Sequence, residues 1–303
     1  MKYVVIGGAG FIGSHMVDLL DVHGEVIIID NLSTGKKENV PNHHIHKLDI
    51  IYRSGKLHQI LMDADYVFHF AAKARVQPSI DYPVYFHDTN VNGLLYILDS
   101  LKQNKKLKKF VFSSSSSVYG DAGIYPTPED APKNPSSPYA LQKLIGEYYV
   151  KMYANLYGLP TASLRYFNVF GDRMTVGGSY SLVMGIWVDL IKDGKPITIN
   201  GDGGQSRDFT FVEDVANANL RVALDDKIHS GEVFNIGNGN PISVNEVADM
   251  FWAGTNCKKV YLPPVVEPYI THADNNLAKS TFGWEPTVSL EDWLPIYIKG
   301  VMK

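Results

Sequence analysis

Short apolar runs alternate with longer amphipathic stretches through the first half of the chain. Runs of branched and aromatic residues predict strands, whereas apolar positions three or four apart predict helices. The predicted strands cover residues 3–6, 26–29, 66–70 and 110–112, and the predicted helices cover 13–23 and 84–102. Strands that are apolar throughout and separated by helices are typical of a parallel sheet covered on both faces. The pattern therefore predicts an α/β fold with a Rossmann-like, doubly wound parallel sheet.

The pattern changes after Arg165, where glycine and proline interrupt shorter segments, as at Gly177-Gly178. We expect a smaller, loop-rich C-terminal substrate-binding region there. The stretch 209–236 again has the pattern of a helix and a strand, so we expect it to return to the main sheet. The expected domains are a Rossmann domain of residues 1–165, joined by 206–236, and a substrate-binding region of residues 166–205 and 237–303.

The composition excludes several functional classes. The formal net charge of the 303 residues is −4, which disfavours nucleic acid as a partner, because phosphate backbones are bound by clustered Lys and Arg. No apolar run reaches the ~18 residues of a membrane span. Cys257 is the only cysteine, so no intramolecular disulfide can form, which favours a reducing compartment. We therefore expect a cytoplasmic protein with no membrane partner.

Glycines follow the first predicted strand in the segment 7–13, Gly-Gly-Ala-Gly-Phe-Ile-Gly. Between a strand and a helix, this spacing is the fingerprint of a dinucleotide-binding loop. Gly7 permits the tight turn, Gly10 lets the backbone approach a pyrophosphate, and Gly13 lets helix and strand pack closely. Asp30 ends the second predicted strand, where a carboxylate accepts both ribose hydroxyls of NAD and repels the extra phosphate of NADP. These residues predict NAD as the cofactor.

A tyrosine and a lysine four residues apart, Tyr139 and Lys143, follow Pro138 at an expected helix start. On a helix the two side chains share a face. Tyrosine ordinarily loses its proton near pH ~10, but a neighbouring ammonium favours the phenolate, so Tyr139 is a candidate base. Such a pair is common by chance. Together with the dinucleotide loop and the serine run 113–117 after a predicted strand, it predicts a catalytic site.

Motifs of one known pattern run almost from end to end of the chain. They are residues 7–13, 30–35 (Asp-Asn-Leu-Ser-Thr-Gly), 49–50 (Asp-Ile), 69–72 (His-Phe-Ala-Ala), 90–93, 112–120, the Tyr139/Lys143 pair, 165–168 (Arg-Tyr-Phe-Asn), 201–203, 207–209 and 273–274. With these motifs the chain resembles the extended short-chain dehydrogenase/reductases, and within them the NAD-dependent nucleotide-sugar 4-epimerases that act on UDP-glucose or UDP-GlcNAc.

The resemblance implies a role for each matching residue. Ser115 would hydrogen-bond the reacting sugar hydroxyl, Tyr139 would take its proton, and Lys143 would hold the nicotinamide ribose and lower the pKa of the tyrosine. The implied NAD-binding residues are Gly7, Gly10, Phe11, Ile12, Gly13, Asp30, Asn31, Thr34, Gly35, Asp49, Ile50, Phe70, Ala71, Ala72, Asn90, Ser113, Tyr139, Lys143 and Tyr166. The implied substrate-binding residues are Ser115, Asn168, Asn200, Arg207 and Thr271, and no metal is implied.

The implied reaction is an isomerisation, the 4-epimerisation of a UDP-hexose through a transient 4-keto sugar. Related dehydratases and decarboxylases carry carboxylates directly after the counterpart of Ser115, whereas this chain has Ser116 and Ser117. That difference favours epimerisation. Thr271 is small where a large aromatic accompanies enzymes restricted to glucose and galactose, so we expect UDP-GlcNAc and UDP-GalNAc to fit as well.

Three departures from the family pattern stand out. The family commonly has a second phosphate-binding arginine before the Ala273-Asp274 pair, whereas residues 263–269 contain none. Asn200 replaces an aromatic residue that often lies by the uracil. A nucleotide other than UDP therefore remains an alternative. Gln142 replaces the usual small residue before Lys143, and we expect no consequence from it.

Other interpretations stay open at this point. One is another nucleotide-sugar oxidoreductase of the same family, a UDP-uronate epimerase or a keto-sugar reductase. Another is a non-catalytic NAD-binding regulator, which would not need the Tyr139/Lys143 pair. Three histidines at positions 43, 44 and 46 suggest a metal, but no cysteine or carboxylate accompanies them, which favours a solvated loop. The resemblance also implies a homodimer formed through two helices of each subunit.

Overall fold

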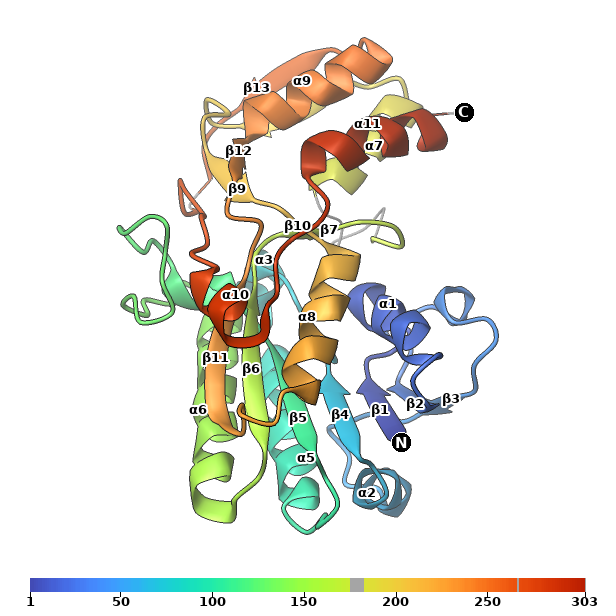
Figure 1. Ribbon diagram of the computed structural model, residues 1–303. Coiled ribbons are helices and arrows are strands. Elements are labelled where there is room, and N and C mark those ends of the chain that lie inside the picture. Colours follow the sequence, from blue (N-terminus) through green and yellow to red (C-terminus); the bar gives the residue numbers. More distant parts are fainter. Residues whose placement is uncertain (175–182, 266, 303) are drawn as a thin grey trace.

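The computed structural model describes residues 1–174, 183–265 and 267–302. Its centre is a sheet of seven parallel strands in the order β11-β6-β5-β4-β1-β2-β3 (Figure 1). The strands are β1 (Lys2–Ile6), β2 (Glu25–Asp30), β3 (Ile45–Lys47), β4 (Tyr66–His69), β5 (Lys109–Ser115), β6 (Thr161–Tyr166) and β11 (Ser230–Ile236). The strand order runs outward in both directions from β1 and β4, which confirms the predicted doubly wound, Rossmann-like class.

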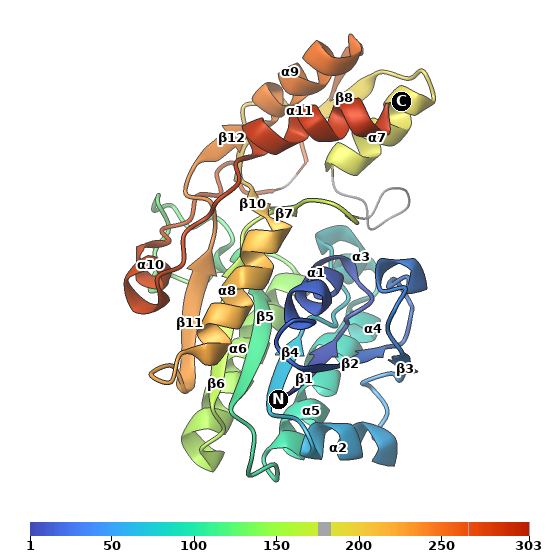
Figure 2. The ribbon, with the colours of Figure 1, turned by 45° about the vertical axis from the view of Figure 1, so that its right-hand side comes forward.

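Helices cover both faces of this sheet (Figure 2). One face carries α1 (Phe11–Leu20) and α8 (Val212–Leu224), and the other carries α2 (Gly55–Met62), α5 (Leu94–Leu101) and α6 (Pro138–Tyr157). Alternate residues of β1 enter the two cores: Val5 packs with the first pair of helices and Val4 with the second set. Both are fully buried, which explains why the strand is apolar throughout.

The predicted helix 84–102 is interrupted in the structure. Its parts are α4 (Pro83–His87), a π-helical segment η2 (Asp88–Gly93) and α5, preceded by α3 (Val76–Asp81). Asn90 lies in the π-helical segment, where its side chain binds the backbone of Lys73 instead of facing solvent. A π-helical turn inside a helix is often found at a functional site.

A second lobe lies above the carboxyl ends of the strands in Figure 1. It consists of α7 (Val183–Lys192), β8 (Ile197–Asn200), β9 (Ser206–Asp208), β12 (Pro241–Ser243), α9 (Val244–Thr255), β13 (Lys259–Leu262) and α11 (Leu290–Val301). Trp187 and Phe251 pack together in its core, with ring centroids 5.4 Å apart. Gly177 and Gly178, which mark a loop in the sequence, lie outside the described residues.

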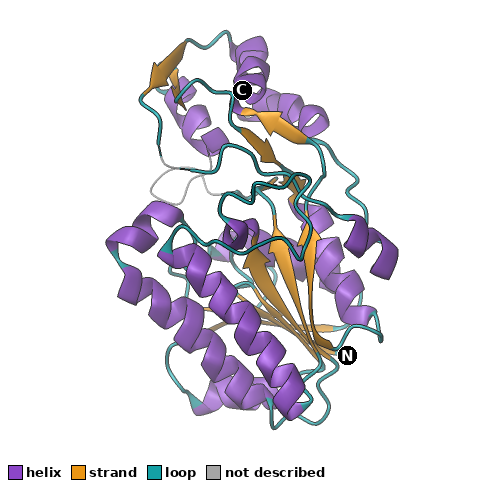
Figure 3. Ribbon diagram, turned by 90° about the vertical axis from the view of Figure 1, so that its left-hand side faces the viewer, coloured by secondary structure: helices purple, strands orange, loops and turns teal. Residues whose placement is uncertain are grey.

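The chain returns to the sheet between segments of the second lobe. After β7 (Val169–Phe170) and β10 (Thr210–Phe211), α8 packs on α1 and leads to β11, which pairs in parallel with β6. Later, α10 (Asn276–Phe282) packs on β11 through contact of Phe282 with Phe234. Figure 3 shows the molecule from the left-hand side of Figure 1, with helices in front of the central sheet and the second lobe above it. Short 3₁₀ segments complete the described elements at η1 (Lys37–Asn39) and η3 (Ser116–Tyr119).

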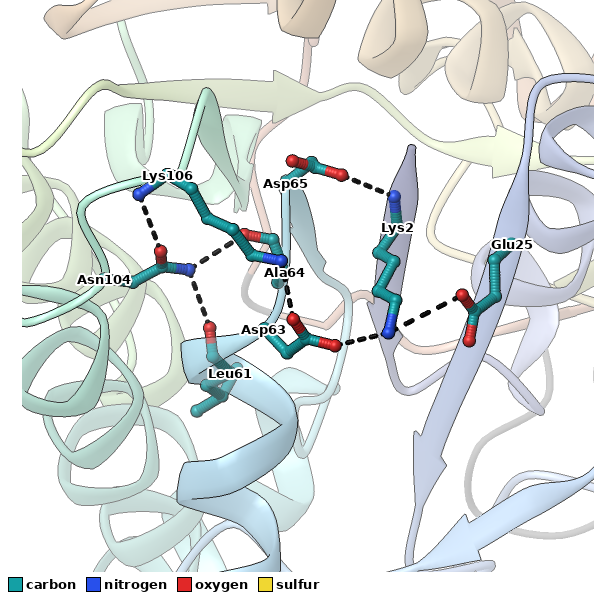
Figure 4. A network of polar contacts seen from close by, with 8 residues as sticks. All are labelled: Lys2, Glu25, Leu61, Asp63, Ala64, Asp65, Asn104 and Lys106. Atoms are coloured by element: carbon teal, nitrogen blue, oxygen red, sulfur yellow. Dashed lines mark hydrogen bonds and ion pairs between the residues drawn. The ribbon is translucent and has the colours of Figure 1, made fainter.

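A polar network connects the amino-terminal ends of the central strands (Figure 4). Asp63 accepts hydrogen bonds from Lys2 and Lys106, and these two lysines hold the pKa of its carboxyl low, at about 2. The side-chain amide of Asn104 donates to the carbonyls of Leu61 and Ala64, both at 2.8 Å. These contacts lie at the end of the sheet opposite the glycine loop.

Among the described residues, no helix is long and apolar enough to cross a membrane.

Candidate active site

The glycine loop adopts the geometry that its sequence predicts. Gly7 has a φ of +84°, a left-handed conformation that favours glycine, and its N–H donates to Ile29 O at 2.7 Å. A Cβ at Gly13 would lie 2.2 Å from Gly7 O, so only glycine lets α1 approach the loop this closely. Gly10 is the N-cap of α1. Because it has no side chain, the N–H groups at the start of the helix stay open to a phosphate. The loop therefore fits the pyrophosphate of a dinucleotide.

A pocket opens beside this loop, at the point where the strand order reverses. It brings together ten of the predicted cofactor residues: Gly7, Gly10, Asp30, Asn31, Thr34, Asp49, Ile50, Phe70, Ala71 and Ala72. Phe11, Ile12 and Gly13 open α1 next to it, and a Cβ at Gly35 would touch Asp30. Ligands of doubly wound sheets bind at this position.

Asp30 is fixed by the loop that it serves. Its carboxylate accepts hydrogen bonds from the backbone N–H groups of Ala9 at 3.0 Å and Leu32 at 2.8 Å. Burial raises the pKa of this carboxyl, and the two backbone hydrogen bonds oppose that shift. Asn31 is held in turn by Asp49, to which its amide donates at 2.8 Å. The pocket thus presents an oriented carboxylate at the end of β2.

Asp30→Asn is expected to weaken NAD binding by about tenfold or more, because a hydrogen bond to a charged group contributes roughly 1.5–3 kcal/mol. An amide oxygen also replaces only one of the two carboxylate acceptors that hold Ala9 and Leu32. Calorimetric titration with NAD and NADP checks this, with Asp226→Asn on an exposed residue as control. NAD affinity equal to wild type in Asp30→Asn would contradict the role given to this carboxylate.

Lys73 was not singled out from the sequence, yet it lines the same pocket. Its side chain is buried, its Nζ donates to Ser33 Oγ at 3.1 Å, and it lies 4.9 Å from the ring centroid of Tyr85. Its backbone is clamped by the amide of Asn90, which donates to Lys73 O at 2.9 Å and accepts from Lys73 N at 2.8 Å. The pocket therefore contains a buried cation suited to a phosphate. Its only sequence signal is a lysine directly after the Ala71-Ala72 strand end.

The expectation that Gln142 has no consequence is wrong. Gln142 is buried, and its Oε1 accepts a hydrogen bond from Asn90 Nδ2 at 2.8 Å. Its own amide donates to Pro83 O at 3.3 Å. A longer polar residue at this position thus connects α6 to the π-helical segment that clamps Lys73. The sequence could not reveal this contact, because 52 residues separate the two partners.

The predicted catalytic residues meet where β5 faces the start of α6. Pro138 is the first residue of α6 and Ser137 caps it, accepting from Ala140 N at 3.2 Å. Burial raises the pKa of Tyr139, whereas hydrogen bonding with Ser115 and the positive charge of Arg75 lower it. Ser115 Oγ also accepts from Ser117 Oγ at 2.9 Å. The serine and the tyrosine are therefore adjacent, as a base and an orienting hydroxyl must be.

Lys143 is held by the strand rather than by the tyrosine. Its buried Nζ donates to Ser113 O at 2.7 Å and lies 5.9 Å from the ring centroid of Tyr139. Burial lowers the pKa of its ammonium to about 8. Arg75, which belongs to none of the sequence motifs, supplies the positive charge that favours the Tyr139 phenolate. Its φ of +119° is costly for a non-glycine residue, and such strain clusters at functional sites.

Two further predicted cofactor residues, Ser113 of β5 and Tyr166 of β6, meet across the neighbouring strands. Tyr166 OH lies 3.1 Å from Ser113 Oγ and donates to Asn219 Oδ1 at 3.0 Å. All three side chains are buried, and burial raises the pKa of the Tyr166 phenol. The phenol therefore stays protonated and serves as a hydrogen-bonding support.

The predicted substrate residues divide between two places. Asn168 and Thr271 meet directly, since the Asn168 amide donates to Thr271 Oγ1 at 3.0 Å. Asn200 instead lines a cavity of about 530 Å³ in the second lobe, whose wall also includes Glu267 and Tyr269. Arg207 contacts the wall of this cavity, because its Nη2 forms an ion pair with Glu267 Oε2 at 2.8 Å.

The model of the NAD dependent epimerase/dehydratase family matches residues 3–237. The chain belongs to this family. It is 42% identical over 296 residues to a putative UDP-glucose 4-epimerase of Methanocaldococcus jannaschii, covering 95% of this chain and 94% of that protein. It is 35% identical to a UDP-glucose 4-epimerase of Mycolicibacterium smegmatis, covering 96% of each.

Solved structures of family members superpose over nearly the whole chain. The UDP-glucose 4-epimerase of Thermotoga maritima with UDP-glucose has a TM-score of 0.91 at 37% identity and covers 99% of this chain and 98% of that one. The UDP-N-acetylglucosamine 4-epimerase of Methanobrevibacter ruminantium with UDP-N-acetylmuramic acid has a TM-score of 0.90 at 37% identity, covering 99% and 96%. The predicted family, fold class and NAD cofactor are confirmed by these comparisons.

Proposed function

We propose that the chain is an NAD-dependent 4-epimerase of UDP-hexoses. The observation that carries the proposal is the meeting of Ser115, Tyr139 and Lys143 at the carboxyl end of β5, beside the dinucleotide pocket. The two residues after Ser115 are serines, so no carboxylate is placed there to eliminate water or assist decarboxylation. The arrangement therefore suits reversible oxidation of a hydroxyl without a further bond cleavage.

Each residue of the site has a separate role in the proposed reaction. Ser115 orients the C4 hydroxyl, and Tyr139 as phenolate takes its proton. The positive charge of Arg75 favours that phenolate. Lys143 in its protonated form holds the nicotinamide ribose. When bound beside these residues, NAD would supply a reversible acceptor for the C4 hydride. The 4-keto sugar turns in the site, and Tyr139 gives the proton back to the oxygen of the epimer.

The proposed substrate range rests on the predicted substrate residues Asn168, Thr271 and Arg207. Thr271 is small and is engaged by Asn168, which leaves room for an N-acetyl group on the sugar. Arg207 offers a positive charge for the diphosphate, and Glu267 pairs with it in the structure. Glu267 must therefore release Arg207 when a nucleotide sugar binds. The relatives named for UDP-glucose and UDP-N-acetylglucosamine support both substrates.

The test is direct interconversion of the sugars. Purified protein incubated with UDP-glucose, UDP-galactose, UDP-GlcNAc or UDP-GalNAc, without added cofactor, is expected to produce the 4-epimer, followed by NMR of the anomeric protons. UDP-glucuronate is a further arm, since a family member at 32% identity is named as a UDP-glucuronate 4-epimerase and Arg75 offers a charge near Tyr139. Silence with all UDP-hexoses from folded protein would remove the assignment.

The proposal includes a homodimer. Exposed apolar side chains gather on one face of α6, at Leu141, Tyr148, Met152 and Leu156, and continue on α4 with Val84 and Tyr85. Such a contiguous apolar surface is typical of a subunit interface. A cytoplasmic location belongs to the same proposal and rests on the lone Cys257.

A charge in this surface is expected to break the dimer. Leu156→Glu would bury a carboxylate in the proposed interface, which costs several kcal/mol. Light scattering after gel filtration should give a mass near 33.7 kDa for this variant and twice that for wild type. Ile296→Glu on α11, where the side chain is 74% exposed, is the control and should remain dimeric. A monomeric wild type would refute the dimer.

A further inference from the structure

Glu147 lies on the same face of α6 as the catalytic pair, because Tyr139, Lys143 and Glu147 follow one another at intervals of four residues. Each of the three meets one of the consecutive serines that end β5. Tyr139 hydrogen-bonds with Ser115, Lys143 Nζ donates to Ser113 O at 2.7 Å, and Ser114 Oγ donates to Glu147 Oε1 at 2.5 Å. The helix and the strand are therefore joined at three successive turns.

A second strand joins the same carboxylate. Arg165 of β6 is the partner of Ser114 in the sheet register, so the two side chains approach Glu147 together. Arg165 Nε donates to Glu147 Oε1 at 2.8 Å and its Nη2 to Oε2 at 2.7 Å, a forked pair. The side chains of Glu147 and Arg165 are 4% and 3% exposed. The arginine is held in place by Tyr119 OH at 2.6 Å.

We propose that Glu147 is a positioning residue for the reaction, which fixes the Tyr139–Lys143 face of α6 against the serine-bearing end of β5. This inference rests on the proposed function, because it requires Tyr139 and Lys143 to be the reacting pair. Glu147 touches neither the cofactor pocket nor Tyr139; it acts through Lys143 and through Ser114, the neighbour of Ser115.

The charge of Glu147 has its own effect on Lys143. Burial lowers the pKa of Lys143 to about 8, and the Glu147 carboxylate opposes that shift. His69 of β4 also faces Lys143, but burial lowers the pKa of its imidazole to about 3, so it is neutral in the working range. Burial raises the pKa of Tyr139 on the same helix, so its phenol is neutral at rest and adds no negative charge near Lys143, whereas the phenolate is the form that reacts. Among the described residues, Glu147 is thus the anion that keeps Lys143 charged.

The experiment compares Glu147→Gln with Glu147→Asp. Glutamine keeps the length and loses the charge, whereas aspartate keeps the charge and shortens the reach. In Glu147→Gln we expect the Lys143 ammonium to titrate at a lower pH than in wild type, measured by ¹⁵Nζ NMR of labelled lysines and assigned with Lys143→Arg. This readout needs no substrate, so it stands even if no UDP-hexose is turned over. In Glu147→Asp the midpoint should stay near that of wild type.

Activity provides the second readout. In Glu147→Gln the alkaline limb of the kcat profile should move to lower pH together with the NMR midpoint, and kcat should fall about tenfold or more with KM changed less than about twofold, as misplaced catalytic groups cause. Glu291→Gln on an exposed residue of α11 is the matched control. A Lys143 midpoint and kcat profile equal to wild type in folded Glu147→Gln would overturn the proposal.

A buried arginine without its partner can prevent folding. If Glu147→Gln does not fold, the double variant Glu147→Met/Arg165→Met removes both charges and replaces them with apolar side chains of similar size. A folded double variant with a lowered Lys143 midpoint supports the positioning role. A folded double variant with an unchanged midpoint and unchanged kcat shows that the pair only stabilises the fold.

Discussion

Tyr139→Phe is expected to lower kcat by about 10²–10⁴-fold, the range that a positioned acid–base group contributes. Phenylalanine fills the same space but has no oxygen to accept the proton of the C4 hydroxyl. Bound NAD should remain at the wild-type level, because the pocket that brings together the glycine loop and Asp30 does not include this ring. The measurement is steady-state epimerisation, combined with the NAD content released from purified protein.

Tyr148→Phe is the matched control on the same helix. Tyr148 is 64% exposed and lies outside the candidate active site, so its hydroxyl has no part in the proposed chemistry. It should therefore retain wild-type kcat. If Tyr139→Phe kept more than about a tenth of the activity, the base would be another group, because loss of a true acid–base residue costs more than that.

Gly13→Ala is expected to abolish retention of NAD. The added methyl group would lie 2.2 Å from Gly7 O and 2.9 Å from Gly8 Cα, and these are backbone atoms that cannot rotate away. Either α1 or the glycine loop must shift, which moves the N–H groups at the start of α1 away from the pyrophosphate that they would bind. Calorimetric titration with NAD measures the loss directly.

The control for this substitution is Gly55→Ala. Gly55 begins α2, and a Cβ built there meets no atom within 4 Å. It also gains helix propensity, so the variant should bind NAD normally and be at least as stable as wild type. NAD binding by Gly13→Ala with wild-type affinity would show that the loop tolerates a wider approach than the structure allows.

Local patterns predicted most of the sheet, because burial on both faces leaves a strong signal, although the fully buried strand β6 was not predicted. The four predicted strands overlap β1, β2, β4 and β5. The strand β3 (Ile45–Lys47) was missed, since it is a three-residue edge strand with histidine in its middle. Helix α2 was missed as well, although Ser54 caps it by accepting from Leu57 N at 3.1 Å. Short, half-exposed elements carry little periodicity, so tertiary contacts decide them.

The active site was predictable only where its residues belong to contiguous motifs. The glycine loop and the Tyr139/Lys143 pair are local in sequence, and the structure places them at the carboxyl ends of β1 and β5, with only β4 between these strands. Arg75, Lys73 and the Glu147–Arg165 pair were not found, because their meaning depends on sheet register and helix phase. Ser114, Glu147 and Arg165 are separated by 33 and 18 residues in these contacts. No pattern along one segment predicts that they meet.

The return of α8 and β11 to the sheet also limits how this molecule can change. A fragment ending after β6 would lack β11 and expose the edge of β6 along its whole length. It would also lose α8, which covers α1 and with it the outer side of the glycine loop. Neither lobe is therefore an autonomous unit that gene fusion could transplant. New sugar specificity must arise by substitutions and loop insertions within the second lobe. The residues proposed for hydride transfer remain together, because segments of the sheet alternate along the chain with segments of that lobe.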